Sequence, residues 1–374
     1  MGCCFSSEGS GSKRKQESTV TSQIQRAEST MPIEPVISES VVTVEAPLAE
    51  FITNLGLQGC GRAFTYKEMY VATYGFRIDR LLGEGGFGQV YMGFLDSINQ
   101  EVAIKRLDLQ GQQGDREFVT EIVMLSNLHH PNLVNLVGYC ADDGQRILVY
   151  EYMPLGSLYS HIHDLHPSRQ PLDWSTRIMI LLGAAKGLEY LHNKVDRSVI
   201  NRDVKCANIL LGEGYHPKLS DFGLAKLGPI GDNTHVSTRV MGTPGYCAPE
   251  YLMTGKLTVS TDIYSFGVVM LEVLSGRMAR DESLPVPERN LAPWAVKHVM
   301  ERDIANLVDP ALQGQYSLDY MYPAFFIAAK CALESPAMRP TIREVVHALT
   351  MISEPEARRR PERGGPSTPT RTKF

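Results

Sequence analysis

Apolar and polar positions alternate in short runs over the first half of the patterned region, and a helical period replaces this alternation in the second half. Runs with two-residue alternation, separated by turns that contain glycine, predict strands at 80–82, 89–94, 101–105, 133–140 and 147–152. One helix is expected among them, at about 115–128. Over 174–191, apolar residues recur every three or four positions, which indicates one buried helix face. Strands followed by helices predict an α+β protein with two lobes of different class.

Both ends of the chain lack this patterning. The first 50 residues contain 13 Ser or Thr and no sustained apolar period, and the last residues are rich in Arg, Pro and Gly. Such segments cannot bury a core, so we expect them to be disordered. The predicted organisation is a disordered N-terminal segment (1–60), an extension of the globular domain (61–75), a β-rich lobe (76–152), a helical lobe (153–352) and a disordered basic tail (353–374).

Charge and composition exclude several classes of protein. Among 374 residues, 37 basic and 42 acidic side chains give a formal net charge of −5, which leaves no electrostatic footprint for nucleic acid. Seven cysteines without a CxxC pair, and no signal peptide, predict a reduced intracellular protein. No apolar run approaches the roughly 18 residues that a membrane-spanning helix needs.

A glycine-rich segment, Gly83-Glu84-Gly85-Gly86-Phe87-Gly88, matches the pattern GxGxxG. In a dinucleotide-binding βαβ unit a helix would open at the third glycine, but here a β-like run follows. We therefore favour a flap between two antiparallel strands, where absent side chains let backbone N–H groups approach phosphate oxygens.

Lys105 ends the apolar run Val102-Ala103-Ile104 and would place an ammonium group beneath that flap. A carboxylate on the following helix can hold it by an ion pair and aim it at two phosphates. Glu121 and Glu117 are the two candidates. Glu121 is preferred because apolar residues surround it at helical spacing.

Two further strings supply the remaining polar groups: Arg202-Asp203-Val204-Lys205-Cys206-Ala207-Asn208, and Asp221-Phe222-Gly223. Phosphoryl transfer needs such a set, because one carboxylate accepts the hydroxyl proton while an amide and a second carboxylate bind Mg²⁺ through oxygen. Each string alone could be a solvated turn. Because both strings follow the flap and Lys105 in this order and at these spacings, a chance match of the whole set has a very small probability.

With Ala248-Pro249-Glu250 and Asp262 to Gly267 following in order, the sequence resembles the eukaryotic protein kinases over about 62–352. The segments Phe64 to Met69 and Leu148 to Met153 resemble plant receptor-like kinases. The start Met1-Gly2-Cys3-Cys4 is similar to that of receptor-like cytoplasmic kinases, which are Pelle-type serine/threonine kinases. The resemblance implies a two-lobed kinase fold, with a small antiparallel β-rich N-lobe that has one main helix and a larger helical C-lobe.

The resemblance also implies a role for each matched residue. Asp203 would be the catalytic base, Lys205 would contact the γ-phosphate, and Lys105 with Glu121 would hold the other phosphates. Asn208 and Asp221 would bind magnesium or manganese. The ATP site would comprise Gly83, Glu84, Gly85, Gly86, Phe87, Gly88, Val90, Ala103, Lys105, Tyr150, Glu151 and Met153.

Arg202 is expected to be an unpaired cation near the activation segment, 221–250. Phosphorylation of Ser237 or Thr238 would supply oxygens for it, and the alternative is that these hydroxyls only solvate a loop. Thr243 is a third candidate phosphorylation position, although the resemblance also implies that its hydroxyl bridges Asp203 and Lys205. Two structural roles complete the set: a buried Glu250–Arg339 ion pair, and Asp262 bracing the catalytic loop.

The N-terminus fits a lipidation pattern, with Gly2 as a myristoylation site and Cys3 and Cys4 as palmitoylation sites. One acyl chain binds a membrane only marginally, so stable anchoring needs a second. The first 50 residues carry 4 basic and 7 acidic side chains, so electrostatics alone would not hold them at an anionic leaflet. The sequence predicts lipid anchoring at the inner leaflet of the plasma membrane.

The leading hypothesis is a membrane-anchored serine/threonine kinase that uses ATP with Mg²⁺ to phosphorylate proteins and relays signals from a cell-surface receptor kinase. The alternative is a pseudokinase scaffold, because Asn201 stands where His or Tyr is usual. His161, His163 and His166 are not expected to bind metal, because they lack a rigid helical pair and a cysteine partner. Cys206 and Cys247 are expected to be packing residues.

Overall fold

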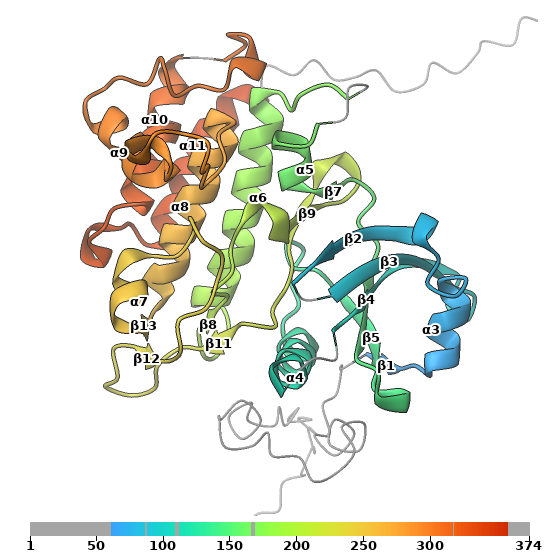
Figure 1. Cartoon of the computed structure of the whole chain (residues 1–374). Coiled ribbons are helices and arrows are strands. Elements are labelled where there is room, and N and C mark those ends of the chain that lie inside the picture. Colours follow the sequence, from blue (N-terminus) through green and yellow to red (C-terminus); the bar gives the residue numbers. More distant parts are fainter. Residues whose placement is uncertain (1–60, 87, 109–111, 166–168, 317, 358–374) are drawn as a thin grey trace, which may run out of the picture. The chain divides into compact units, whose positions relative to one another are not determined.

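The computed structural model describes residues 61–86, 88–108, 112–165, 169–316 and 318–357, which belong to one compact unit (Figure 1). The predictions for residues 1–60, including Gly2, Cys3 and Cys4, and for Phe87, His166 and residues 358–374 lie outside the described residues. Within this unit a β-rich lobe is followed along the chain by a helical lobe. The α+β class and the two-lobed organisation are therefore confirmed.

A six-stranded sheet forms the N-lobe, in the order β1-β5-β6-β4-β3-β2. All neighbours pair antiparallel except β1 with β5. Alternate residues of the central strand β4, such as Val102 and Ile104, are fully buried, and this alternation makes one face of the sheet apolar. The strands are β1 (Arg62–Ala63), β2 (Leu81–Gly85), β3 (Gly88–Leu95), β4 (Gln100–Arg106), β5 (Leu136–Cys140) and β6 (Ile147–Glu151).

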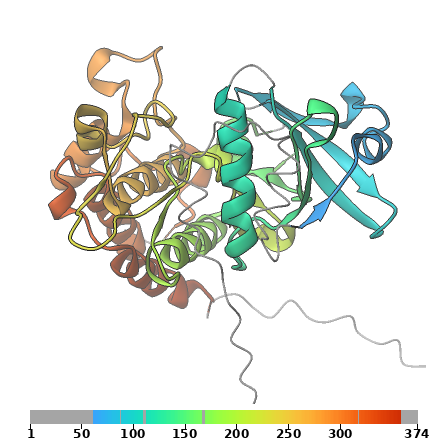
Figure 2. The same ribbon diagram turned by 90° about the horizontal axis from the view of Figure 1, so that it is seen from below.

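Two helices accompany the sheet. Helix α3 (Tyr66–Ala72) begins at a capping box of Thr65 and Glu68 and lies against the sheet on the side away from the C-lobe (Figure 1). Helix α4 (Gln112–Asn127) lies between the sheet and the C-lobe (Figure 2). Its predicted range was 115–128, and buried Phe118 and Ile122 belong to a core that continues into the C-lobe.

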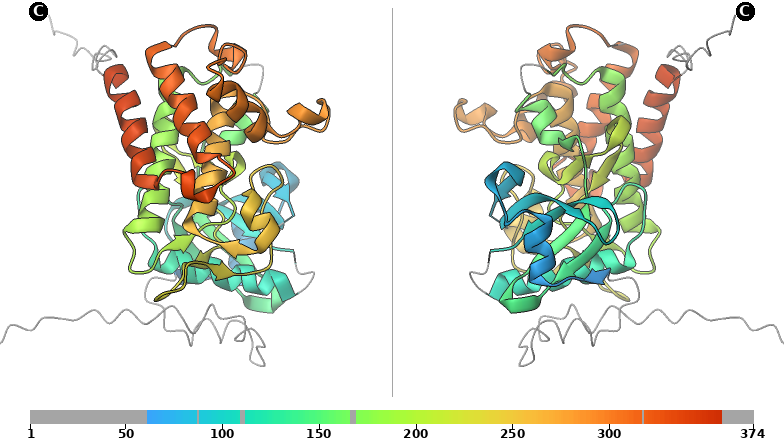
Figure 3. Two further views of the ribbon diagram at one scale, coloured as in Figure 1. Left: turned by 90° about the vertical axis from the view of Figure 1, so that its left-hand side faces the viewer. Right: turned by 90° about the vertical axis from the view of Figure 1, so that its right-hand side faces the viewer.

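The C-lobe is built around α8 (Val259–Ser275), in which every residue from Thr261 to Ser275 is buried. Helix α11 packs along α6, and α10 packs along α8 (Figure 3). The other helices are α5 (Leu158–Ile162), α6 (Trp174–Asn193), α7 (Pro249–Thr254), α9 (Leu291–Met300), α10 (Leu318–Cys331) and α11 (Ile342–Ala357). In the described part of the chain, no helix has the length and apolar character to cross a membrane.

Short strands occur in the loops of the C-lobe, and 3-10 turns occur in the loops of both lobes. The strands are β7 (Gly156–Ser157), β8 (Val199–Ile200), β9 (Ile209–Leu211), β10 (Pro217–Leu219), β11 (Lys226–Leu227), β12 (Val236–Ser237) and β13 (Lys256–Leu257). The 3-10 turns are η1 (Ile78–Arg80), η2 (Asp142–Gly144), η3 (Cys206–Asn208), η4 (Glu213–Tyr215), η5 (Val286–Glu288), η6 (Pro310–Leu312) and η7 (Pro336–Met338).

Several predicted boundaries differ from the structure by a few residues. The strand expected from 133 begins at Leu136, because Leu133 instead forms an isolated parallel bridge with Leu219 of the other lobe. The helix α11 continues to Ala357, past the predicted end of the C-lobe at 352. In the first case a long-range backbone bridge overrides a local apolar run.

Candidate active site

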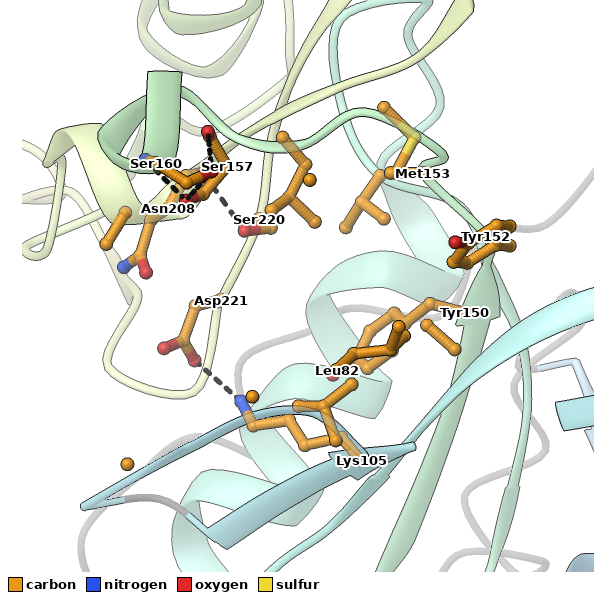
Figure 4. A pocket seen from close by; sticks show the side chains of 18 of the residues that line it. Leu82, Lys105, Tyr150, Tyr152, Met153, Ser157, Ser160, Asn208, Ser220 and Asp221 are labelled. Carbon is orange, nitrogen blue, oxygen red and sulfur yellow. Dashed lines mark hydrogen bonds and ion pairs between the residues drawn. The ribbon is translucent and has the colours of Figure 1, made fainter. Parts of the chain in front are cut away.

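A cavity of about 790 Å³ lies between the lobes (Figure 4). Its roof is the β2–β3 hairpin, its back is the connection between the lobes, and its floor is formed by the catalytic loop and β9. Most of the residues predicted for nucleotide and metal binding line it: Gly83, Glu84, Gly85, Gly86, Gly88, Val90, Ala103, Lys105, Glu121, Tyr150, Glu151, Met153, Lys205, Asn208 and Asp221. Sequence reasoning missed several polar residues that also line it, namely Ser157, Ser160, Asp164, Arg169 and Ser220.

The glycine-rich segment forms the predicted antiparallel hairpin. Gly83 pairs with Val90 and Gly85 with Gly88. Gly88 has φ +115°, and an added Cβ there would lie 2.1 Å from the carbonyl oxygen of Arg106. Only glycine fits this close approach, so the hairpin can lie directly over the cavity.

Lys105 is held by two carboxylates. Its Nζ lies 2.9 Å from Oδ1 of Asp221 and 3.3 Å from Oε2 of Glu121, and the first of these ion pairs is visible in Figure 4. The expected partner on the helix is therefore Glu121, whereas Glu117 packs beside Gly223. The pair of Lys105 with Asp221 was not predicted, because the two residues are far apart in sequence.

Burial and charge act in opposite directions on this cluster. Burial disfavours the ammonium form of Lys105, but the carboxylates of Asp221 and Glu121 outweigh it and raise the pKa of Lys105. Burial raises the pKa of Glu121, and the charge of Lys105 opposes that rise. Lys105 is therefore a stable cation in the position where phosphate oxygens would bind.

Four side chains meet at the catalytic loop. Asp203 accepts a hydrogen bond from the Thr243 hydroxyl at 2.6 Å, and its other oxygen lies 2.6 Å from Nζ of Lys205. Lys205 also donates to the Thr243 hydroxyl at 2.9 Å. Asn208 donates through Nδ2 to the backbone and side chain of Asp203, at 2.9 and 3.1 Å. Thr243 thus bridges Asp203 and Lys205, in the arrangement that the resemblance implied.

Asp262 braces this loop from helix α8 and is itself fully buried. It accepts from the backbone N–H groups of Asn201 and Arg202 at 2.8 and 2.9 Å, and from Nε2 of His192 at 2.9 Å. Asn201 is buried as well, and its Oδ1 accepts from the backbone N–H of Asp203 at 3.2 Å. Asn201 therefore supports the catalytic loop by a side-chain bond, and the pseudokinase alternative is not favoured.

Arg202 has no carboxylate among its contacts in the described residues, but neutral groups of the chain bind it, which the sequence analysis did not anticipate. Its guanidinium is buried and donates to the carbonyl oxygens of Leu224 and Arg239, at 3.2 and 2.8 Å, and to the hydroxyl of Tyr251 at 2.7 Å. No local pattern predicts these partners, because two are backbone groups and Tyr251 lies 49 residues away.

The connection between the lobes carries three residues of the expected ATP site: Tyr150, Glu151 and Met153. Tyr150 is buried, and burial followed by the charge of Glu121 raises the pKa of its hydroxyl. The Glu151 carboxylate is bound by Nζ of Lys218 on β10, at 2.7 and 3.0 Å. This ion pair between hinge and C-lobe was not predicted from sequence.

The predicted ion pair of Glu250 and Arg339 is present and bidentate, with both N–O distances 2.7 Å. It joins the end of the activation segment to the loop before α11. Arg339 also lies over the ring of Tyr264 on α8, 5.0 Å from its centroid.

The remaining histidines and cysteines have structural partners. His161 is bonded to the carbonyl oxygen of Leu155 at 2.8 Å, and His163 to the buried carboxylate of Glu272 at 2.7 Å. Burial raises the pKa values of Cys206 and Cys247, which opposes nucleophilic reactivity. In the described ranges no group of three potential ligands that could hold a metal ion occurs among His, Cys, Asp and Glu.

Comparisons with known proteins agree with this geometry. A family model described as protein tyrosine and serine/threonine kinase matches residues 76–349. Three proteins of Arabidopsis thaliana are similar over most of this chain. Serine/threonine-protein kinase PBL27 is 60% identical over 78% of the chain and 57% of its own length. Probable serine/threonine-protein kinase PBL7 is 57% identical over 83% of the chain and 84% of its own length. Serine/threonine-protein kinase PBS1 is 57% identical over 79% of the chain and 65% of its own length. The chain thus spans less than two thirds of PBL27 and of PBS1.

Proposed function

Because this chain belongs to the protein tyrosine and serine/threonine kinase family, whose members use ATP and a divalent metal ion, we propose that it is an active serine/threonine kinase anchored at the plasma membrane. Its substrates are Ser and Thr hydroxyls of proteins. The observation that carries the catalytic part is the bridge of Thr243 between Asp203 and Lys205, beside the cavity that holds Lys105.

Asp203 is the group that accepts the proton of the substrate hydroxyl. That oxygen attacks the γ-phosphorus of ATP, the bond to the β,γ-bridging oxygen breaks, and ADP leaves. Lys205, bonded to Asp203, offsets negative charge on the transferred phosphoryl group, and Lys105 binds the phosphates that stay on ADP. Little covalent chemistry falls to the protein, so positioning and charge supply most of the rate enhancement.

Asn208 and Asp221 fit a divalent cation. Asn208 donates through Nδ2 to Asp203, so its amide oxygen can bind a cation. Asp221 accepts from Lys105 through Oδ1, so its Oδ2 can bind the same cation. Two hard oxygen donors and room for phosphate oxygens suit Mg²⁺, with Mn²⁺ as the substitute. The metal ion, when bound, neutralises charge on the β- and γ-phosphates.

Transfer of radiolabel from γ-labelled ATP to a generic protein substrate tests the enzyme. Asp203→Asn should lower the rate by about 10²- to 10⁴-fold, as expected for loss of a general base. Lys105→Ala should lower it as well. Equal labelling by the wild type and both variants would show that the activity comes from a contaminant.

The membrane part of the proposal rests on the sequence of the N-terminus. Myristate on Gly2 and palmitate on Cys3 or Cys4 would together hold the protein at the inner leaflet. In cells, Gly2→Ala should move the protein to the soluble fraction, while Gly9→Ala should not. Continued sedimentation of Gly2→Ala with membranes would count against acylation as the anchor.

We further propose that the protein relays signals from a cell-surface receptor kinase, which phosphorylates its activation segment. Ser237 is exposed and lies on β12 next to Thr238. A phosphate on Thr243 would remove the hydroxyl hydrogen that Thr243 donates to Asp203 and would place negative charge beside that carboxylate. We therefore propose Ser237 and Thr238 as the phosphorylation sites. The inactive Asp203→Asn variant, incubated with ATP and membranes that contain receptor kinases, should gain phosphate there by mass spectrometry. Absence of phosphate at both positions would refute the relay.

A further inference from the structure

Helix α3 carries apolar side chains on both of its sides. Met69 and Ala72 are buried in the core of the N-lobe. Tyr70 and Val71, in contrast, are 52% and 58% exposed. In the right-hand view of Figure 3, α3 lies in front of the sheet, and no helix or strand of the described residues covers it. Apolar surface that stays exposed as one contiguous patch is typical of a binding surface.

Two residues beyond the helix extend this apolar surface. Tyr74 is 62% exposed and Ile78 is 80% exposed. The turn after Tyr74 lies against the end of the helix, because the N–H of Gly75 donates to the carbonyl oxygen of Tyr70 at 2.7 Å. We call the four exposed side chains Tyr70, Val71, Tyr74 and Ile78 the α3 face.

Two cations without a carboxylate partner in the described ranges border the α3 face. Lys67 is exposed and lies one helical turn before Val71. The guanidinium of Arg80 lies over the ring of Tyr74, 5.0 Å from its centroid. Three other charged contacts next to α3 are made within the domain: Arg62 with Glu68 at 2.6 Å, Arg77 with Asp79 at 3.0 Å, and Asp142 with the backbone N–H of Tyr66 at 3.3 Å. Lys67 and Arg80 therefore remain available to an anionic partner.

This combination of side chains suits a lipid surface. Tyr is enriched where water meets the acyl chains, aliphatic side chains enter that boundary, and Lys and Arg attract anionic headgroups. The α3 face and its two cations supply all three. Its side chains are exposed on the outside of a helix, whereas a peptide commonly binds in a groove. The N-terminal segment that carries the predicted lipidation sites joins the domain at β1, which directly precedes α3.

We propose that the α3 face binds an anionic membrane surface and orients the acylated kinase on it. The inference rests on the proposed membrane anchoring, to which it adds a second contact made by the folded domain. This contact also supplies positive charge that the first 50 residues lack, since they carry 4 basic and 7 acidic side chains. Helix α3 lies on the side of the sheet away from the C-lobe, so the cavity between the lobes stays open to ATP and protein substrates (Figure 1). The contact is weak by itself and becomes effective once acyl chains raise the local concentration of the domain at the membrane.

The test uses the full-length chain with Gly2→Ala in every protein, so that no myristoyl chain contributes. Partitioning is measured by flotation with vesicles of phosphatidylcholine that contain about 30% phosphatidylserine, and with vesicles of phosphatidylcholine alone. The protein should partition onto the anionic vesicles at high lipid concentration, and less as salt is added. The double variant Val71→Ser, Ile78→Ser should lower the partition coefficient at least about tenfold, because two exposed aliphatic side chains are lost. Lys67→Gln should lower it about fivefold, the effect of one basic charge near an anionic leaflet.

Val286→Ser and Lys297→Gln are the matched controls. Val286 is 71% exposed and Lys297 is exposed as well, but both belong to the C-lobe. Each control should partition as the parent protein does. Calorimetry with ATP should give the same affinity for all the proteins, which shows that the exposed substitutions leave the fold intact.

Two results would overturn the proposal: no flotation of the parent protein with the anionic vesicles, or flotation that the Val71→Ser, Ile78→Ser variant retains in full. The α3 face would then be left to a soluble protein partner. Neither result bears on phosphoryl transfer or on acylation, which are measured separately. Conversely, if Gly2→Ala in cells showed that acylation is not the anchor, the vesicle measurement would still report on the α3 face, because it uses protein without myristate.

Discussion

Replacing Glu250 by Gln perturbs the ion pair that ties the activation segment to the C-lobe. In the wild type, the Arg339 side chain is fully buried and all its N–H directions have acceptors. Two of them go to the Glu250 carboxylate at 2.7 Å. The amide of Gln keeps one oxygen but turns an N–H₂ group toward the guanidinium, so one bond becomes a donor–donor contact.

The expected cost follows from these contacts. One hydrogen bond to a charged group contributes about 1.5–3 kcal/mol, and removing one partner of a buried ion pair costs about 3–5 kcal/mol in total. The Glu250 side chain is 22% exposed, so water relieves part of the loss. We therefore expect the free energy of unfolding to fall by about 3 kcal/mol, which is the lower end of that range. At about 2–4 °C per kcal/mol, this lowers Tm by roughly 6–12 °C.

Denaturant unfolding of the purified protein measures this quantity, with thermal unfolding as a second measurement. Glu213→Gln is the matched control, since Glu213 is exposed and its replacement should change the free energy of unfolding by less than about 0.5 kcal/mol. A Glu250→Met, Arg339→Met double variant should be less destabilised than the sum of the two single variants. A loss below about 1 kcal/mol for Glu250→Gln would refute the reasoning that the buried guanidinium depends on this carboxylate.

Two further predictions concern the nucleotide site. Gly88→Ala should weaken ATP binding measured by calorimetry, because the new Cβ would clash with the carbonyl oxygen of Arg106. An unchanged affinity would count against this close packing of the hairpin. Lys105 should stay protonated across the working pH range: its pKa is raised above the ordinary 10.5, so its favourable charge is fully present below pH 10.5 and is lost only as the pH rises through the higher value. ATP affinity that falls with an apparent pKa below 9, and no longer does so in Lys105→Met, would contradict this.

Local patterns predicted much of the fold and the site. The strand around Lys105 and the helix over 174–191 follow from periodicity, and the structure extends the helix only to Asn193. The residues that line the cavity follow from short strings whose chemistry is specific in combination. Contacts such as that of Glu250 with Arg339 came from resemblance, because 89 residues separate the partners and no local rule links them.

The contacts that sequence reasoning missed share a physical cause. Lys218 with Glu151, and Tyr251 with Arg202, join side chains that neither periodicity nor spacing brings together. The partners of Arg202 include backbone carbonyl groups, which every residue carries and which therefore leave no trace in composition. The sequence therefore indicates only that Arg202 lacks an anionic partner, whereas the folded chain supplies neutral hydrogen-bond acceptors for its guanidinium.

Helix α8 explains how these distant groups reach one position. Because α8 is buried from Thr261 to Ser275, its polar side chains there must be bonded, and several of these bonds go to the catalytic loop and the activation segment. Asp262 near its start holds the catalytic loop through two backbone N–H groups, and Glu272 near its end accepts from the hydroxyl of Tyr246, close after Thr243. The catalytic loop and the segment that carries Thr243 are therefore positioned by the same rigid helix, so the contact of Thr243 with Asp203 is determined by the core of the C-lobe rather than by either loop alone.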